Sequence, residues 1–359
     1  MKKIILAIFL TATIGLPSCM KYGPGDMEDF YVSLDPEVVT GKGLFITNEG
    51  NFMYGNASLS YYDPERKTVQ NEIFYRANGI KLGDVAQSMV IHNGIGWVVV
   101  NNSGVIFAID INTFKMIGKI TGFTSPRYMH FLSEDKAYVT QLWDERICVV
   151  NPQTFEITGY IHTEMVAGSE STEQMVQYGK YVFTNCWSYN DRILVIDTVI
   201  DEVVDEIKVG IQPTSMVLDC NNKIWTVTDG GYSGSPYGEE VPSLYCIDAE
   251  TRKIEKQFTF KNGDFPSEVE LNGTRDTLYF INYDIWRLPV TADRFPVRPF
   301  IKYKETMFYG LTVNPVNSEV YVADAIDYVQ PGVILRYSAE GELLDEFKVG
   351  ITPGAFCWR

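Results

Sequence analysis

The stretch DKAYVTQLWDERICVVNPQTFE, residues 135–156, decides the fold because it is one unit of a repeat. It contains two short apolar runs, AYVTQ and ICVVN, separated by a polar turn that carries Trp143. Runs of β-branched and aromatic residues bounded by Asx and other polar residues are typical of consecutive antiparallel strands. A large aromatic residue such as Trp143 is unusual in a polar turn between strands, and the position of this turn in the repeat explains it.

Seven segments of the chain share the pattern of residues 137–141, an apolar run that ends on an amide or an aspartate. They are GLFITN, GWVVVN, AYVTQ, YVFTN, IWTVTD, LYFIN and VYVAD, ending at Asn48, Asn101, Gln141, Asn185, Asp229, Asn282 and Asp324. Successive end residues are 53, 40, 44, 44, 53 and 42 positions apart. These spacings are close to the period of a four-stranded propeller blade.

Each of these segments has the neighbours that a complete blade requires. An apolar run such as PTSMVLDC (213–220) precedes it, and a second apolar run closing on an Asx turn follows. An amphipathic run such as EVVDEIKVG (202–210) then alternates charged and apolar residues, as an outer edge strand does. No helical periodicity of useful length competes with this pattern. The sequence therefore predicts an all-β, seven-bladed propeller with four-stranded blades.

The two ends of the repeat predict how the ring closes. The first segment, 43–48, lacks a preceding inner strand, whereas the chain finishes on PGAFCWR, residues 353–359. We expect this C-terminal strand to complete blade one, because closure removes the exposed sheet edge of an open array. Residues 289–300 fit the pattern worst, since they place three prolines where blade six needs outer strands.

The first 18 residues resemble a bacterial lipoprotein leader. Lys2 and Lys3 precede an apolar run that is too short to span a bilayer, and LPSC at 16–19 resembles a lipobox. This predicts lipidation at Cys19; a plain secretory signal is the alternative. Residues 19–41 are rich in Gly, Pro and acidic residues and are expected to form a flexible tether, with the propeller occupying residues 42–359.

Charge and cysteine usage exclude several classes of protein. The formal net charge of −16 argues against nucleic acid as a partner, because binding to phosphate backbones relies on clustered Lys and Arg. Besides Cys19, five cysteines are scattered without CxxC pairs, which argues against a disulfide framework or a zinc site. We expect most of them to be buried strand residues.

A ligand-binding mouth is predicted on one face of the propeller. The turn after each amide-ended strand and the connection between blades emerge on the same face, and many of these segments carry aromatic or polar residues. Trp143 is thus expected to line the mouth, although strand-end amides and blade-edge aromatics also have purely structural uses. The candidate ligand-binding residues are Tyr54, Asn102, Arg127, Trp143, Asn185, Trp187, Tyr189, Tyr232, Asn282, Tyr283, Tyr309, Asp324 and Tyr328.

Catalytic and metal-binding patterns are thin. The only histidines, His92, His130 and His162, fall on parts of the repeat that are kept apart, so a histidine-based metal site or a Ser-His-Asp triad is not expected. Carboxylates near the mouth offer a weak signal for a cation or for sugar hydroxyls. The sequence therefore predicts a binding protein without catalytic residues, resident metal or cofactor.

The repeat resembles the YncE-like, or YVTN-type, seven-bladed propellers, with YVTQ at 138–141 closest to their name motif. The resemblance runs from about Gly43 to the C-terminus and is specific for the fold but not for the ligand.

The lipobox, the acidic tether and the aromatic mouth together resemble surface lipoproteins of the cobalamin-capturing BtuG family. This resemblance implies a lipid anchor in the outer membrane and exposure at the cell surface. It also implies capture of cobalamin or a related corrinoid and delivery to a TonB-dependent outer-membrane transporter. Two other functions stay open. One is an adhesion or scaffolding propeller that binds glycan or protein, and the other is a metal-dependent lactonase-like or lyase-like enzyme.

Overall fold

The computed structural model describes residues 35–163, 171–302 and 307–359, and residues 35–359 form one compact unit. The expected leader, the lipidation site Cys19 and most of the expected tether lie outside the described residues. Within the described part, the chain is already bonded to the blades at Glu37, whose N–H donates to Gln70 Oε1, and at Val39, whose N–H donates to Asn112 O.

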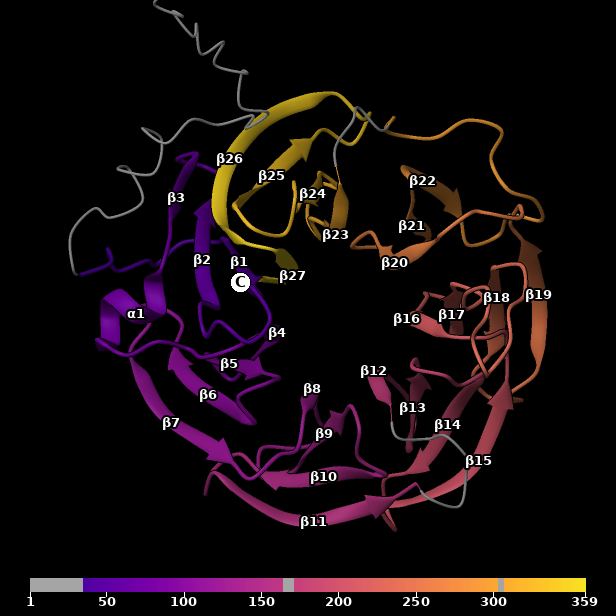
Figure 1. Ribbon diagram of the computed structural model, residues 1–359, viewed down its shortest axis with the longest axis horizontal. Coiled ribbons are helices and arrows are strands. Elements are labelled where there is room, and N and C mark those ends of the chain that lie inside the picture. Colours follow the sequence, from indigo (N-terminus) through magenta and orange to yellow (C-terminus); the bar gives the residue numbers. More distant parts are fainter. Residues whose placement is uncertain (1–34, 164–170, 303–306) are drawn as a thin grey trace, which may run out of the picture. The chain divides into compact units, whose positions relative to one another are not determined.

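The compact unit is a seven-bladed β-propeller, which confirms the predicted fold. Seven antiparallel sheets surround a common centre, each with its innermost strand toward that centre (Figure 1). From inner to outer strand, blade one consists of β27 (Pro353–Trp358), β1 (Leu44–Asn48), β2 (Ser58–Asp63) and β3 (Thr68–Gln70). Blade two consists of β4 (Ala86–His92), β5 (Ile95–Val100), β6 (Val105–Asp110) and β7 (Met116–Thr121). Blade three consists of β8 (Pro126–Phe131), β9 (Ala137–Gln141), β10 (Arg146–Asn151) and β11 (Glu156–His162), and blade four of β12 (Thr172–Tyr178), β13 (Tyr181–Cys186), β14 (Arg192–Asp197) and β15 (Glu202–Lys208). Blade five consists of β16 (Pro213–Leu218), β17 (Lys223–Thr228), β18 (Ser243–Asp248) and β19 (Ile254–Thr259). Blade six consists of β20 (Ser267–Leu271), β21 (Thr277–Asn282) and β22 (Asp284–Pro289). Blade seven consists of β23 (Phe308–Val313), β24 (Val320–Asp324), β25 (Pro331–Tyr337) and β26 (Leu343–Ile351).

The C-terminal strand closes the ring as predicted. Strand β27 pairs antiparallel with β1, with Leu44 opposite Trp358 and Ile46 opposite Phe356. The last residue also holds the closure, because the Arg359 guanidinium donates to Val39 O at 3.0 Å and to Ile111 O at 3.1 Å. Residues more than 300 positions apart thus form one blade.

The burial of each strand follows its place in the blade. The middle strands have apolar neighbours on both faces, and every residue of β9 and of β24 is buried. Outer strands keep only alternate residues covered, as in β15, where Ile207 is buried between exposed Glu206 and Lys208. This difference explains why the middle strands read as continuous apolar runs and the outer strands as alternating ones.

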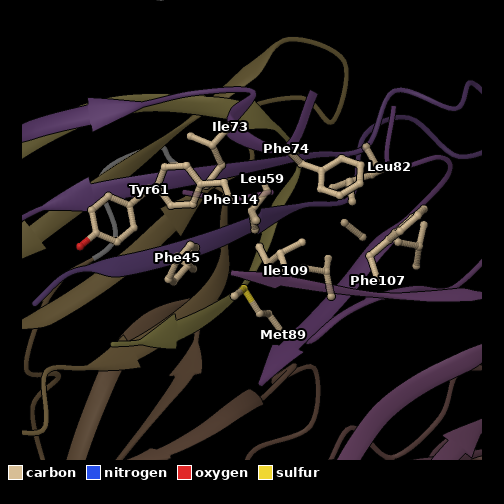
Figure 2. Close-up of a cluster of buried hydrophobic side chains, with 14 of the residues drawn as sticks. Phe45, Leu59, Tyr61, Ile73, Phe74, Leu82, Met89, Phe107, Ile109 and Phe114 are labelled. Atoms are coloured by element: carbon tan, nitrogen blue, oxygen red, sulfur yellow. The ribbon is translucent and has the colours of Figure 1, made fainter. Parts of the chain in front are cut away.

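Neighbouring blades pack face to face through layers of apolar side chains. Figure 2 shows the layer between blades one and two, in which Phe45 and Tyr61 meet Phe114 at ring-centroid distances of 5.9 and 5.7 Å. A short helix, α1 (Ile73–Asn78), lies in the connection between these blades and buries Ile73 and Phe74 in the same layer. The sequence pattern did not predict this helix, because six residues are too few to display a helical period.

Blade six departs from the four-stranded prediction. Its described residues form three strands, and among them an isolated bridge between Ile285 and Ile301 lies where an outer strand would pair. The proline-rich segment between them instead inserts Phe295 against Phe258, Phe260 and Phe280. Proline lacks the N–H that a β-ladder needs, so a loop whose Phe295 side chain packs on the blade replaces the fourth strand.

Two further features concern the residues that the model describes. None of the helices among them is long and apolar enough to cross a membrane. The five cysteines among them are free thiols, and Cys148, Cys186 and Cys246 are buried strand residues as predicted, whereas Cys220 is exposed in a turn.

Candidate functional site

A cavity of about 650 Å³ lies at the centre of the propeller, at the end where the chain enters the innermost strands. All seven innermost strands contribute to its wall. One contributor from each, in the order β27, β4, β8, β12, β16, β20 and β23, is Ala355, Ser88, Arg127, Glu173, Thr214, Glu268 and Tyr309. Its size falls in the range of small-molecule sites in proteins.

The rim of the cavity comes from the segments that the sequence assigned to the mouth. Trp187, Tyr283 and Tyr328 lie in turns after the second strands of their blades, while Phe265 and Met307 lie in connections that lead into innermost strands. The predicted face is therefore the one with the cavity.

The thirteen predicted site residues fall into three groups. Those that line the cavity are Arg127, Trp187, Tyr283, Tyr309 and Tyr328. Those that are exposed on turns outside the cavity wall are Tyr54, Asn102, Trp143, Tyr189 and Tyr232. Those that are buried at the ends of second strands are Asn185, Asn282 and Asp324.

The buried group holds the blade connections in place rather than lining the cavity. Asn185 donates its side-chain N–H to Pro213 O at 2.7 Å, at the start of the next innermost strand. Asn282 and Asp324 accept the backbone N–H groups of Phe265 and Met307, at 3.1 and 3.0 Å. These strand-end residues thus position the two connections whose side chains form part of the rim.

Trp143 belongs to an aromatic group on the exposed rim. Its ring centroid is 6.4 Å from that of Tyr189, which stacks on Tyr237 at 4.6 Å, and Tyr232 shares a side-chain hydrogen bond with Tyr189. Trp143 and Tyr189 have φ angles of 62° and 61°, in the left-handed region that bulky residues rarely adopt. The aromatic residue in the opening turn therefore extends the mouth without reaching the cavity wall.

An ion pair lies inside the cavity wall. The Arg127 Nε–H donates to both carboxylate oxygens of Glu173, at 2.8 and 2.9 Å, and the side chains are only 14% and 4% exposed. Burial alone would lower the pKa of Arg127, but Glu173, together with the neighbouring Tyr128 and Glu49, outweighs burial and the pKa is raised. Nearby, Tyr309 donates its O–H to Glu49 Oε1 at 2.9 Å, and burial raises the pKa of Glu49.

Two further carboxyl groups in the wall were not among the predicted site residues. Glu268 and Glu270 lie on β20, and both line the cavity. Burial raises the pKa of each to about 8, and the neighbouring charges of Glu270, Glu49 and Glu173 contribute at Glu268. Two glutamates in alternation on an innermost strand, in the sequence SEVEL, are the signal that would have identified them.

The channel continues below this cavity. A second cavity of about 220 Å³ is lined partly by Tyr128, Gln174 and Glu270, which also line the first. These three side chains therefore form the floor of the upper cavity. Deeper in the channel, His130 is hydrogen-bonded through Nε2 to Gln177 Oε1 at 3.0 Å, as a satisfied core histidine is.

Comparison with protein-family models gives one match, over residues 42–350, to a domain of unknown function, DUF5074. The chain belongs to the DUF5074 family. A search of curated proteins finds no match.

Solved structures resemble this DUF5074 protein in fold. A quinonprotein alcohol dehydrogenase-like protein from Bacteroides thetaiotaomicron matches with a TM-score of 0.67 and 15% identity, over 88% of this chain and 77% of that one. The periplasmic gluconolactonase of Pseudomonas aeruginosa matches with a TM-score of 0.64 and 11% identity, over 88% and 98%. Apo AztD from Citrobacter koseri matches with a TM-score of 0.57 and 11% identity, over 89% and 98%. At these identities the likeness concerns the propeller fold alone.

The raised pKa values of Glu268 and Glu270 predict how the stability of the DUF5074 protein depends on pH. A carboxyl whose pKa is higher in the folded than in the unfolded state stabilises the fold fully below the unfolded pKa, and this contribution is lost as pH rises through the folded value. We therefore expect the free energy of unfolding to fall between about pH 5 and pH 9. Urea unfolding at several pH values measures this, and the fall should be smaller in a Glu268→Gln/Glu270→Gln variant. An identical pH profile in the variant would contradict the assignment.

Proposed function

We propose that this DUF5074 protein is a binding protein that captures a corrinoid at the propeller mouth. We further propose that it is lipid-anchored at the outer membrane and passes its ligand to a TonB-dependent transporter. The observation that supports a binding role is the central cavity, to which all seven innermost strands contribute and which opens beneath a rim of aromatic side chains.

The chemistry of the mouth suits both parts of a corrinoid. A corrinoid has a broad apolar body and a rim of carboxamides. The exposed rings of Trp143, Tyr189 and Tyr237 offer apolar faces, while carboxylates such as Glu268 can accept hydrogen bonds from carboxamide N–H groups inside the cavity. In this arrangement the rim contacts the body of the ligand and the cavity takes part of its polar edge.

Closure of the ring favours slow release of such a ligand. The turns that carry the rim are fixed to seven packed blades, and strand-end residues such as Asn282 hold the connections. Little conformational entropy is then lost when the ligand binds, and the resulting gain in affinity is expressed mainly as a lower dissociation rate.

The test is a titration of residues 20–359, which include the whole closed ring, with cyanocobalamin. Calorimetry and tryptophan fluorescence should show tight binding of one ligand per chain. The absence of heat and of quenching at high micromolar ligand would contradict the proposal.

Two tryptophan variants locate the site. We expect Trp187→Ala, in the cavity wall, and Trp143→Ala, on the rim, each to weaken binding by about 1–3 kcal/mol, which is roughly 5- to 150-fold. Tyr75→Ala is the matched control, because Tyr75 is an exposed aromatic residue on α1, away from the mouth. Unchanged affinity in both tryptophan variants would remove these residues from the site.

The exposed aromatic group on the rim also favours a second candidate, a propeller that binds glycan. Tyr189 and Tyr237 present stacked rings beside the hydroxyl of Tyr232, and such surfaces suit ligands with both apolar and hydroxyl-bearing faces. Retention of glycans by a protein that does not bind cyanocobalamin would favour this function over corrinoid capture.

A further inference from the structure

The charge of the central cavity is strongly unbalanced. Five carboxyl groups line it, and Arg127 is the one basic side chain among the described residues of its wall. The carboxyl groups are those of Glu49, Glu173, Asp229, Glu268 and Glu270. Arg127 donates to both oxygens of Glu173, and its charge also lowers the pKa of Glu49, but no basic side chain acts on the described carboxyl groups of Asp229, Glu268 and Glu270.

Three of the remaining carboxyl groups have hydrogen-bond donors from the protein. Glu49 accepts from Tyr309, Asp229 accepts from Gly231 N–H at 2.8 Å, and Glu270 accepts from the backbone of Leu271. Glu268 differs from them. No described residue donates a hydrogen bond to it or forms an ion pair with it. The charged groups that affect its pKa are other carboxylates, those of Glu270, Glu49 and Glu173.

The backbone at Glu268 is also irregular. Its φ angle is 52°, in the left-handed region, and the pairing of β20 with β21 shifts register between Ser267 and Glu270. An irregularity of this kind redirects a side chain at the cost of local strain. Here it leaves a partly buried carboxyl group, largely removed from water and without a partner, in the wall of a ligand-sized cavity.

The rest of the cavity wall supplies aromatic rings. Tyr309 and Tyr328 stand nearly perpendicular, at 87° with centroids 5.5 Å apart, and Trp187 is held by a side-chain hydrogen bond to Asp229. Aromatic faces attract cations, and cages of such rings recognise quaternary ammonium groups. Carboxylates beside the rings strengthen the attraction for positive charge.

The geometry points to an organic cation rather than a bare metal ion. In the described part of the chain, no group of three or more His, Cys, Asp or Glu side chains is placed to hold a metal. The cavity, at about 650 Å³, is also far larger than an ion requires.

We propose that the cavity is a binding site for an organic ammonium group, which enters between Glu268 and the rings of Trp187, Tyr309 and Tyr328. This inference does not depend on corrinoid capture, because it concerns the cavity beneath the rim and a ligand group that carries positive charge.

Choline and its neutral carbon analogue, 3,3-dimethylbutan-1-ol, test this directly, because they have nearly the same shape and differ in charge. Calorimetric titration of the purified protein at pH 9, where Glu268 and Glu270 are ionised, should show one choline bound per chain. The neutral analogue should bind at least about tenfold more weakly. Equal binding of the two compounds, or no choline binding at millimolar concentration, would overturn the proposal.

Glu268→Gln removes the charge and keeps the shape of the side chain. We expect it to lower choline affinity by about tenfold or more, while Glu250→Gln, at an exposed position in a turn, leaves it unchanged. The thermal transition of each variant verifies that it is folded. Wild-type affinity for choline in folded Glu268→Gln, or displacement of choline by equimolar calcium chloride, would also overturn the proposal. A failure of cyanocobalamin to bind leaves these outcomes unaffected, so the two proposals can be judged separately.

Discussion

A chain that ends at Thr352 is expected to lose its cooperative thermal transition. Its first blade would lack β27, and the inner edge of β1, all of whose residues are buried in the closed ring, would become accessible. The truncation also removes the hydrogen bond from Trp358 Nε1 to Thr312 Oγ1, which joins blade one to blade seven. Unpaired strand edges promote association between chains, so we expect aggregation on heating. Circular dichroism and light scattering during a thermal scan measure both effects.

The peptide PGAFCWR, added to the truncated chain, provides the control. It should pair with β1 and restore the transition, whereas a scrambled peptide of the same composition should not. A truncated chain that unfolds at the same temperature as the full chain would show that closure through β27 contributes little to stability.

Arg127→Met is expected to lower the free energy of unfolding by about 3–5 kcal/mol at pH 8. The main cause is the unpaired charge that remains on Glu173 and not the lost attraction between the two side chains. Glu173 would keep a buried charge with Glu49 and Glu268 nearby. The loss should shrink at pH 5, since without Arg127 the pKa of Glu173 rises further and the group becomes neutral. Urea unfolding at the two pH values measures the difference.

Two comparisons isolate this effect. The double variant Arg127→Met/Glu173→Leu removes both charges and should recover most of the lost stability. Arg66→Met breaks an exposed pair with Asp63, 3.8 Å apart, and should cost less than about 1 kcal/mol. If Arg127→Met cost no more than Arg66→Met, the buried pair would have no special role in the cavity wall.

The repeat made most of the fold predictable. Strands such as β9 and β24 carry continuous apolar runs because both of their faces are covered, and their common ending recurs in every blade. The closure was visible because one blade lacked an inner strand at its start and the chain ended on a spare one. The missing fourth strand of blade six followed less directly, since the prolines excluded a ladder but did not indicate that Phe295 would pack in its place. Helix α1 is too short to leave a periodic signal.

The site was less predictable because the repeat fixes which face a turn occupies but not how far its side chains reach. Trp187 and Trp143 follow equivalent strands, yet Trp187 lines the cavity and Trp143 lies outside its wall. Asn185 was assigned to the ligand for its polar group, which is bonded to a blade connection. Glu268 lies on an innermost strand and not in a turn, so attention to turns alone overlooked it.

The left-handed turn residues imply a conflict between stability and recognition. Trp143, Tyr189, Tyr283 and Tyr328 all occupy backbone conformations that glycine or asparagine adopts more easily, and all four rings are exposed. Glycine there would relieve strain, so a more stable propeller is accessible by simple substitution at the mouth. A propeller selected only for stability would carry small residues, such as glycine, in the turns at this end. By bearing large rings in strained turns, this one forgoes some thermal tolerance, a cost that the binding role proposed for the mouth would explain.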